Sequence, residues 1–346
     1  MMTAARNAHS DQVRSLPGRL VFREESISWQ GRCLTTGLRY TVRPALHLLT
    51  YVFHWPLPTG IVDWLARFVM IPPKGTVRQP VRLANCGSEL VRAKGVAPAN
   101  GSGRAILYLH GGAFIACGLN THVRIVSTLS RLTDASVLSV DYRMAPHSPM
   151  SDAVQDCVDG YRWLLARGYR PDQIVVAGDS AGGYLSFMVA LTLISEGLTP
   201  PAGIVAMSPL TELDPAGKLG HPNSRTDPVF TAKCFTALEQ IILQANERVL
   251  VDGVPGPLVE PTAEDLTKMP PTLIHASAAE GLVYDAELMT ERLQAARVPV
   301  ELKTWAGQVH VFQAAEAFVP EARQSLQEIG EFIREVAVCA ELPAAG

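Results

Sequence analysis

The sequence is poor in several features that mark whole classes of protein. Its 30 basic and 33 acidic residues leave a formal net charge of −3, so it has no surplus of positive charge to attract nucleic acid. It contains no uncharged apolar run of about 18 residues, the length needed to cross a bilayer. The best candidate, Ala45 to Leu57, is too short and contains two histidines. We therefore expect neither a nucleic-acid partner nor a membrane-spanning helix.

Cysteine is also scarce and scattered. The six cysteines include no Cys-x-x-Cys pair, which argues against a zinc site and against a disulfide framework. The segment from Met1 to Glu24 carries charges throughout and has no apolar run of the kind that a secretory signal needs. We therefore expect a reduced, cytoplasmic protein without a structural metal. The cysteines are Cys33, Cys86, Cys117, Cys157, Cys234 and Cys339.

The chain does have a large apolar fraction, and its apolar residues occur in alternating strand-like and helix-like segments. Hydrophobic residues make up 47% and charged residues 18%, which allows a sizeable core and excludes intrinsic disorder. From about Val81 onward, short β-branched runs alternate with segments of helical period, a pattern that predicts an α/β fold with a mostly parallel, doubly wound sheet. The predicted strands are Ile106–Leu109, Ser136–Tyr142, Ile174–Ala177, Ile204–Met207, Thr272–Ala276 and Val300–Thr304. The predicted helices between them are His122–Leu132, Asp152–Ala166, Tyr184–Ser195, Asp285–Ala296 and Glu321–Val336.

The N-terminal region differs from this alternating part. It is rich in Trp, Leu and Arg, and the apolar positions within Ile61 to Ile71 recur at helical spacing. Pro72 and Pro73 end that helix, because proline cannot continue it. We predict that residues 1–75 form a helical segment that contributes to a cap.

A second irregular region interrupts the later part of the chain. Between Ser208 and Pro271 lie about 60 residues with one clear helix, Thr231–Gln244, in a stretch rich in Gly, Pro and Asp. A segment of that length is more often a functional insertion than a bare loop. We predict that residues 76–340 form the main α/β domain, with a cap insertion at about 212–256.

A nucleophile candidate lies between a predicted strand and a predicted helix. Gly178-Asp179-Ser180-Ala181-Gly182 matches the G-x-S-x-G pattern, which is weak by itself but gains weight from this strand-to-helix position. So sharp a turn strains the serine backbone and requires small neighbours, which the two glycines supply. We therefore expect Ser180 to present its hydroxyl at the carboxyl edge of the sheet, the edge where open α/β sheets bind ligands. An ordinary glycine-rich turn is the alternative.

Backbone donors for an oxyanion are predicted after an earlier strand. Gly111 and Gly112 follow the strand that ends at Leu109, and their missing side chains leave two N–H groups free to face a cleft. The N–H of Ala181, directly after the nucleophile, would be the third donor. His110 precedes these glycines, and we expect it to have a structural role.

The base and the acid are sought downstream of the serine. His310 lies in a loop after a late strand, and the order serine, acid, histidine is that of α/β-hydrolases. Two carboxylates follow the preceding strand, Glu280 in the loop and Asp285 at the start of the next helix, where an acid is commonly a cap or dipole partner. We predict that Ser180, Glu280 and His310 form the catalytic set, with Asp285 as the alternative acid.

Together these motifs resemble the bacterial hormone-sensitive-lipase-like esterases, an α/β-hydrolase family. The resemblance covers roughly Ile106 to the C-terminal helix, and residues 1–74 are similar to the mycobacterial and actinobacterial branch. It implies an eight-stranded sheet, a helical cap, hydrolysis of carboxylic esters with short to medium acyl chains, and no metal or organic cofactor. The matching motifs are His110-Gly111-Gly112, Asp141-Tyr142-Arg143-Met144-Ala145-Pro146, Gly178 to Gly183, Ser208-Pro209-Leu210-Thr211, Asp227-Pro228-Val229 and His310-Val311-Phe312.

Two positions refine this resemblance. Ala113 stands where the family usually has a third glycine, and we expect little loss because it lies beyond the two donors. The run Glu280-Gly281-Leu282 fits the frame of the family's acid motif, with Glu in place of Asp, which supports Glu280 over Asp285.

The expected function is that of a serine carboxylesterase acting on a small-molecule ester. A lipase, an amidase or a deacetylase would use the same chemistry, and a non-catalytic receptor is less favoured because the Ser–acid–His set is complete. A lipase needs an exposed apolar rim, which Trp55, Trp64 and Phe68 would supply, but we expect this stripe to pack on the core. A homodimer is compatible with the sequence, as is membrane association, although no feature indicates the latter.

Overall fold

The sheet at the centre of the molecule contains nine strands in the described part of the chain. A computed structural model describes residues 19–23, 27–51, 60–247, 250–251, 254–255 and 258–339. The strand order is β1-β11-β10-β7-β6-β4-β5-β3-β2, and every pair is parallel except the two pairs made by β3. The strands are β1 (Arg19–Arg23), β2 (Val77–Arg82), β3 (Gly87–Arg92), β4 (Arg104–Leu109), β5 (Ala135–Asp141), β6 (Ile174–Asp179), β7 (Gly203–Met207), β10 (Thr272–Ser277) and β11 (Val300–Trp305).

The predicted α/β fold is confirmed, and the six predicted strands agree with β4, β5, β6, β7, β10 and β11 to within two residues at each end. Three further strands of this sheet were not predicted. Strands β2 and β3 form one edge, where β2 has only exposed and half-buried residues and includes a proline, so its sequence lacks a strong apolar signal. Strand β1 pairs with β11 at the other edge and is the ninth strand, where the family resemblance implied eight.

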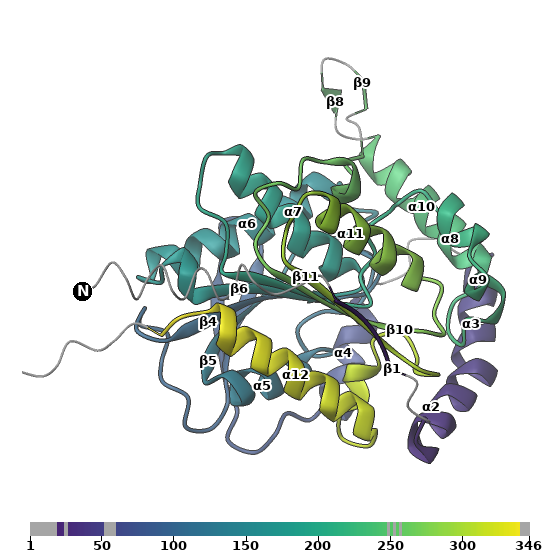
Figure 1. The fold of residues 1–346 in the computed structure, drawn as a ribbon, viewed down its shortest axis with the longest axis horizontal. Coiled ribbons are helices and arrows are strands. Elements are labelled where there is room, and N and C mark those ends of the chain that lie inside the picture. Colours follow the sequence, from purple (N-terminus) through teal and green to yellow (C-terminus); the bar gives the residue numbers. More distant parts are fainter. Residues whose placement is uncertain are drawn as a thin grey trace, which may run out of the picture.

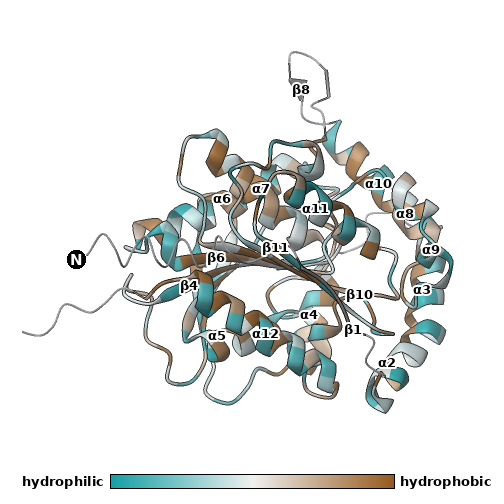
Figure 2. Ribbon diagram, viewed as in Figure 1, coloured by the Kyte–Doolittle hydropathy of each residue, from teal (hydrophilic) through white to brown (hydrophobic). Residues whose placement is uncertain are grey.

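Helices cover both faces of the sheet (Figure 1). Helices α6 (Met150–Ala166), α7 (Ala181–Ser195) and α11 (Val283–Ala295) lie on one face, and α5 (Val123–Thr133) and α12 (Pro320–Val336) lie on the other. Parallel strands enclosed in this way are buried on both sides, and every residue of β6, β7 and β10 is buried. Figure 2 shows the same pattern as a largely hydrophobic sheet between helices with hydrophilic outer faces.

A group of short helices lies at one end of the molecule, at the right in Figure 1. Helices α2 and α3 of the N-terminal region meet α9 and α10 there, and the Arg39 guanidinium donates to the Thr226 carbonyl oxygen at 2.8 Å. Part of the predicted insertion, including 248–249, 252–253 and 256–257, is outside the described residues. The elements concerned are α2 (Trp29–Tyr40), α3 (Val42–Leu49), α8 (Ala216–Gly220), α9 (Asn223–Thr226), α10 (Ala232–Asn246), β8 (Leu250–Val251) and β9 (Val254–Pro255).

Helix α4 (Gly60–Val69) confirms the helix predicted near residues 61–71, but not its packing. Trp64 is 50% exposed and Phe68 is 59% exposed, so the expectation that this stripe packs on the core is wrong for both residues. The helix instead turns Asp63 toward the protein, where its carboxylate accepts hydrogen bonds from the loop before α5. Trp55, the third residue of the predicted stripe, is outside the described residues.

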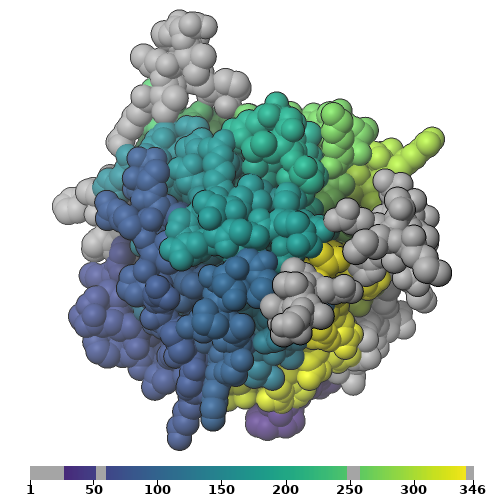
Figure 3. Space-filling model, turned by 90° about the vertical axis from the view of Figure 1, so that its left-hand side faces the viewer, coloured from purple at the N-terminus to yellow at the C-terminus, as the bar shows by residue number. Residues whose placement is uncertain are grey.

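Segments distant in sequence lie side by side across the molecule. Figure 3 shows the blue, teal and yellow parts of the chain in contact on the side that is at the left in Figure 1.

Among the described residues, no helix is long and apolar enough to cross a membrane. All six cysteines are free thiols.

Candidate active site

Ser180 lies on the sharp turn between β6 and α7. Its backbone has φ 53° and ψ −119°, a conformation that is strained for any residue with a side chain. The neighbouring glycines are required by space, because a Cβ at Gly178 would lie 2.2 Å from the Gly182 carbonyl oxygen. A Cβ at Gly182 would in turn lie 1.8 Å from the carbonyl oxygen of Leu109. The predicted strand–serine–helix turn is therefore present in the structure.

Glu280 and His310 form a buried pair after strands β10 and β11. His310 Nδ1 lies 2.6 Å from Glu280 Oε2, and the Glu280 side chain is fully buried. The other carboxylate oxygen, Oε1, accepts hydrogen bonds from Ser277 N at 2.7 Å and from Ser208 Oγ at 2.8 Å. Because these donors fix the carboxylate, it holds Nδ1 of the imidazole and leaves Nε2 as the nitrogen that can accept a proton.

Burial and nearby carboxylates act on the pKa of His310 in opposite directions. Burial is the largest single effect and lowers the pKa of the imidazole, but the charge and hydrogen bond of Glu280, with smaller contributions from Asp227 and Asp179, outweigh it, and the pKa of His310 is raised above its ordinary value. A histidine next to a buried carboxylate is a stronger base than a free imidazole, which suits it to take a proton from a hydroxyl.

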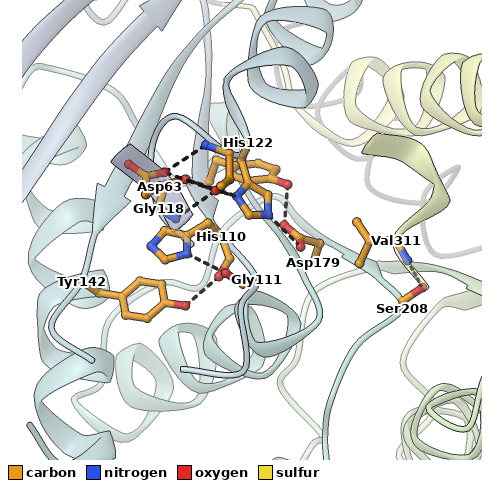
Figure 4. Close-up of polar contacts among 11 residues, drawn as sticks. Asp63, His110, Gly111, Gly118, His122, Tyr142, Asp179, Ser208 and Val311 are labelled. Atoms are coloured by element: carbon orange, nitrogen blue, oxygen red, sulfur yellow. Dashed lines mark hydrogen bonds and ion pairs between the residues drawn. The ribbon is translucent and has the colours of Figure 1, made fainter. Parts of the chain in front are cut away.

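Ser208 connects the serine turn to the histidine loop. Its hydroxyl donates to Glu280 Oε1 at 2.8 Å. It also accepts a hydrogen bond from Val311 N at 3.2 Å (Figure 4). The main chain beside Ser208 is bonded to the nucleophile turn, since Ser180 N donates to the Met207 carbonyl oxygen at 2.9 Å. Leu210 N also donates to the Ser180 carbonyl oxygen at 3.0 Å. The three predicted side chains therefore come from loops joined at the carboxyl edge of the sheet.

Ser208 has a bridging position that sequence reasoning did not assign. It was part of a quoted motif, but without a role. The available signal is its place directly after β7, at the same sheet edge as Ser180. Its left-handed backbone, with φ 47°, aims the hydroxyl between two loops that are far apart in sequence.

Asp285, the alternative acid, lies elsewhere. Its Oδ1 accepts hydrogen bonds from Thr211 N and Glu212 N, both at 2.7 Å, and lies 3.2 Å from Lys218 Nζ. Burial raises the pKa of Asp285, although Lys218 opposes this effect. The structure thus brings Glu280, and not Asp285, to His310, and it places Asp285 where it holds the segment from Thr211 to Lys218.

The first of the predicted oxyanion donors, Gly111, lies against Asp179 of the nucleophile turn. A Cβ at Gly111 would be 2.2 Å from Asp179 Oδ2, and Gly112 has φ 121°, so neither position accepts a larger residue without strain. Among the described residues, no acceptor is hydrogen-bonded to the N–H groups of Gly111, Gly112 or Ala181. These three groups are therefore available to a ligand oxygen, as an oxyanion hole requires.

Ala113 follows these donors in a left-handed conformation, with φ 56°. A residue with a Cβ costs about 1–2 kcal/mol in this region, a cost that a glycine at this position would avoid. The small functional loss expected for Ala113 stays a prediction.

His110 has the surroundings of a structural residue. Its ring stacks on Tyr142 with centroids 4.3 Å apart, and Nδ1 lies 2.8 Å from the Gly111 carbonyl oxygen. Burial, with a contribution from His122, lowers the pKa of His110 to about 4, so the ring is neutral at pH 7. The ring thus supports the glycine turn from behind.

The sequence of this chain is similar to those of known hydrolases. A sequence profile described as alpha/beta hydrolase fold matches residues 106–314. The chain belongs to the α/β-hydrolase family. Esterase LipU of Mycobacterium tuberculosis (strain H37Rv) is 50% identical over 294 residues, which are 85% of this chain and 98% of LipU. Carboxylesterase/phospholipase LipF of the same strain is 47% identical over 312 residues, which are 90% of this chain and 83% of LipF.

A solved structure supports the resemblance of this α/β-hydrolase to the hormone-sensitive-lipase-like esterases. A crystal structure of an esterase from the bacterial hormone-sensitive lipase family superposes with a TM-score of 0.77 at 28% identity. That match covers 91% of this chain and all of the other. The resemblance to the bacterial hormone-sensitive-lipase-like esterases is thereby confirmed.

Proposed function

We propose that this α/β-hydrolase is a serine carboxylesterase in which Ser180 is the nucleophile, His310 the general base and Glu280 the orienting acid. The observation that carries the proposal is the 2.6 Å contact between His310 Nδ1 and Glu280 Oε2. The loop of His310 is bonded to Ser208, and the neighbouring Met207 is bonded to Ser180 N. A complete set of this kind argues against a non-catalytic receptor on the same fold. The names of the relatives support the reaction class, since LipU is an esterase and LipF a carboxylesterase/phospholipase.

The reaction follows from the roles of these groups. Ser180 Oγ attacks the ester carbonyl carbon while His310 Nε2 takes the hydroxyl proton, and the oxygen that becomes negative faces the N–H groups of Gly111, Gly112 and Ala181. The bond to the alcohol oxygen then breaks, His310 returns the proton to that oxygen, and an acyl-enzyme remains. Water attacks the acyl-enzyme by the same route and releases the carboxylic acid. Glu280 keeps its charge throughout and stabilises the imidazolium.

The substrate is expected to be an ester with a short to medium acyl chain. We further propose that residues 1–75 and the insertion at about 212–256 form the cap over the site. Phe230, from this insertion, contacts the ring of His310 edge-on, with centroids 4.9 Å apart. An aromatic side chain against the base reduces the access of water, which favours an apolar acyl group near the reacting carbonyl.

Covalent labelling tests this proposal directly. Diethyl p-nitrophenyl phosphate should transfer one phosphoryl group per chain, and peptide mass mapping should find it on Ser180. With p-nitrophenyl esters from acetate to palmitate, kcat/KM should be largest for the short and medium chains. Labelling at a different residue would refute the nucleophile, and a clear preference for palmitate would refute the chain length.

A second candidate, an esterase acting at lipid surfaces, is favoured by the exposed face of α4. Helix α4 and Ile71, just beyond its end, carry seven large apolar side chains that are about half exposed or more, and Arg67 stacks on two of the rings. Exposed Trp, Phe and Leu beside a cation are typical of helices that lie in a membrane interface. The apolar residues are Ile61, Val62, Trp64, Leu65, Phe68, Val69 and Ile71.

Vesicle binding distinguishes this candidate. The protein should sediment with phosphatidylcholine–phosphatidylglycerol vesicles, and the double variant Trp64→Ser/Phe68→Ser should bind about tenfold or more weakly with unchanged kcat on soluble p-nitrophenyl acetate. A matched control is Leu198→Ser, another exposed apolar side chain, in the loop after α7. Equal binding of the wild type and the double variant would remove the lipid-surface candidate.

A further inference from the structure

A buried polar network lies beside Gly111, one of the proposed oxyanion donors (Figure 4). Asp179, the residue before Ser180, accepts a hydrogen bond from Tyr108 Oη at 2.6 Å and lies 3.1 Å from His122 Nε2. All three side chains are buried, and none of them has a part in the proposed reaction. The network is therefore a cluster of ionisable groups whose purpose the catalytic set does not explain.

The surroundings of His122 determine its protonation. Nε2 faces the carboxylate of Asp179, and Nδ1 lies 3.2 Å from the Gly118 carbonyl oxygen and 2.8 Å from Thr121 Oγ1. The Thr121 hydroxyl donates its own proton to the Gly118 carbonyl oxygen at 2.8 Å, so its oxygen can accept from Nδ1. A carboxylate and a carbonyl oxygen can only accept, so with this arrangement both sides of the ring are satisfied when both nitrogens carry protons. Burial lowers the pKa of His122, but Asp179 outweighs it and the pKa is raised, in agreement with an imidazolium ring.

Helix α4 holds the loop that carries His122. Asp63 Oδ1 accepts hydrogen bonds from Asn120 N at 2.9 Å and from Thr121 N at 3.0 Å, and Oδ2 accepts one from Asn120 Nδ2 at 2.7 Å. A side chain at Gly118 would lie 2.8 Å from the Asp63 carboxyl carbon, so the loop fits closely around this carboxylate. Asp63 of the N-terminal region thus fixes the backbone directly before His122.

The other end of the network touches the oxyanion hole. Asp179 Oδ2 lies against Gly111, where an added Cβ would be only 2.2 Å from it. An uncompensated carboxylate at this place would repel the negative charge that develops on the substrate oxygen, because few water molecules screen it. A positive ring at His122 removes this repulsion and holds Asp179, and with it the backbone of Ser180, in one position.

We propose that His122 is a positioning residue whose positive charge neutralises Asp179 behind the oxyanion hole, and that Asp63 of α4 positions His122. The proposal rests on the proposed function, in which Ser180 is the nucleophile. In this proposal, the contact of Asp63 with the loop before α5 couples the N-terminal region to the position of Asp179 and Ser180.

A pH dependence follows from the two histidines. His310 must be neutral to act as a base, so kcat/KM rises as the pH passes the pKa of His310, which is raised above 6.5. His122 must be charged, so activity falls as the pH passes its own raised pKa. The stabilisation that His122 gives the fold has the same sign: it is complete below the unfolded pKa and is lost as the pH rises through the folded one. The groups that face His122 are Asp179, Tyr108, His110 and Asp63.

The experiment compares His122→Gln with the wild type. Glutamine has no charge to titrate, so kcat should fall about 30-fold with KM within about threefold, and the alkaline limb that His122 causes should disappear while the acid limb stays. In parallel, ¹⁵N-histidine spectra of the wild type at pH 8 should show a ring protonated at both nitrogens that is absent from His122→Gln.

The attachment by Asp63 is tested with a conservative pair. Asp63→Ala should lower kcat about tenfold, whereas Asp63→Asn, which keeps an oxygen for the loop N–H groups, should restore activity to within about twofold. Asp265→Ala is the matched control, because Asp265 also accepts a backbone N–H bond, from Thr267 at 3.0 Å, but on the surface. Its kcat should equal that of the wild type.

Several results would overturn the positioning role. An unchanged alkaline limb in His122→Gln, kcat within threefold of the wild type, or a neutral His122 ring at a pH of full activity would each do so. The ring spectrum is measured on the wild type, so it decides even where a variant fails to fold. Failure of the proposed function would look different, since Ser180 would then accept no phosphoryl label in any of these proteins.

Discussion

Replacing Ser180 with alanine should lower kcat for p-nitrophenyl acetate by about 10⁵- to 10⁶-fold. Without the hydroxyl, His310 has no proton to take and no acyl-enzyme forms, so only the rate enhancement from binding and from the backbone donors remains. The fold should be unaffected, because Ser180 is held by its main chain, through Met207 and Leu210, and not by its side chain. The measurement is steady-state release of p-nitrophenolate, with circular dichroism to compare the folds.

A matched control lies on the helix that follows Ser180. Ser195 is the last residue of α7, and its exposed hydroxyl donates to the Thr192 carbonyl oxygen at 2.8 Å. Ser195→Ala should keep the wild-type kcat. A Ser180→Ala protein that retains more than about one hundredth of the activity, in a preparation free of other esterases, would contradict the nucleophile assignment.

Much of this site could be predicted because its signals are local. The tight turn at Ser180 leaves space only for small residues on both sides, so Gly178 and Gly182 make it recognisable in the sequence. Gly111 and Gly112 make the backbone donors after β4 recognisable for the same reason. Buried parallel strands are equally visible, because both of their faces must be apolar.

Features that depend on partners distant in the chain could not be predicted. Ser208 and His122 are ordinary polar residues in the sequence, and their roles arise only when the ends of β7 and β6 lie beside other loops. Asp179 occupies the variable position before the serine in G-x-S-x-G, so the motif gives no reason to single it out.

The stripe on α4 shows a different limit of sequence reasoning. Helical spacing of apolar residues predicts one apolar face, and this face exists. Spacing does not say what covers the face, and here the polar Asp63 faces the protein while Trp64 and Phe68 face outward. Periodicity thus predicted the helix correctly and its packing wrongly.

Replacing Glu280 with glutamine should lower kcat by about 10³- to 10⁴-fold, by giving His310 the wrong tautomer. Ser277 N and Ser208 Oγ both donate to Oε1, so the amide oxygen of glutamine must take that place. The amide NH₂ then faces His310 Nδ1, which has to accept a hydrogen bond and leaves its proton on Nε2. A ring protonated at Nε2 cannot take the proton of Ser180.

Asp285→Asn, the matched change at the alternative acid, should change kcat little and lower the stability of the fold. Its kcat should stay within about tenfold of the wild type, because the hydrogen bonds of Asp285 go to Thr211, Glu212 and Lys218. Its free energy of unfolding should fall by about 3 kcal/mol, since Lys218 is buried and would lose the charge that compensates its own. Stopped-flow and steady-state rates at one pH, with urea unfolding of each variant, separate the two effects. Should Asp285→Asn lose more kcat than Glu280→Gln, Asp285 would be the orienting acid, and the contact between Glu280 and His310 would need another explanation.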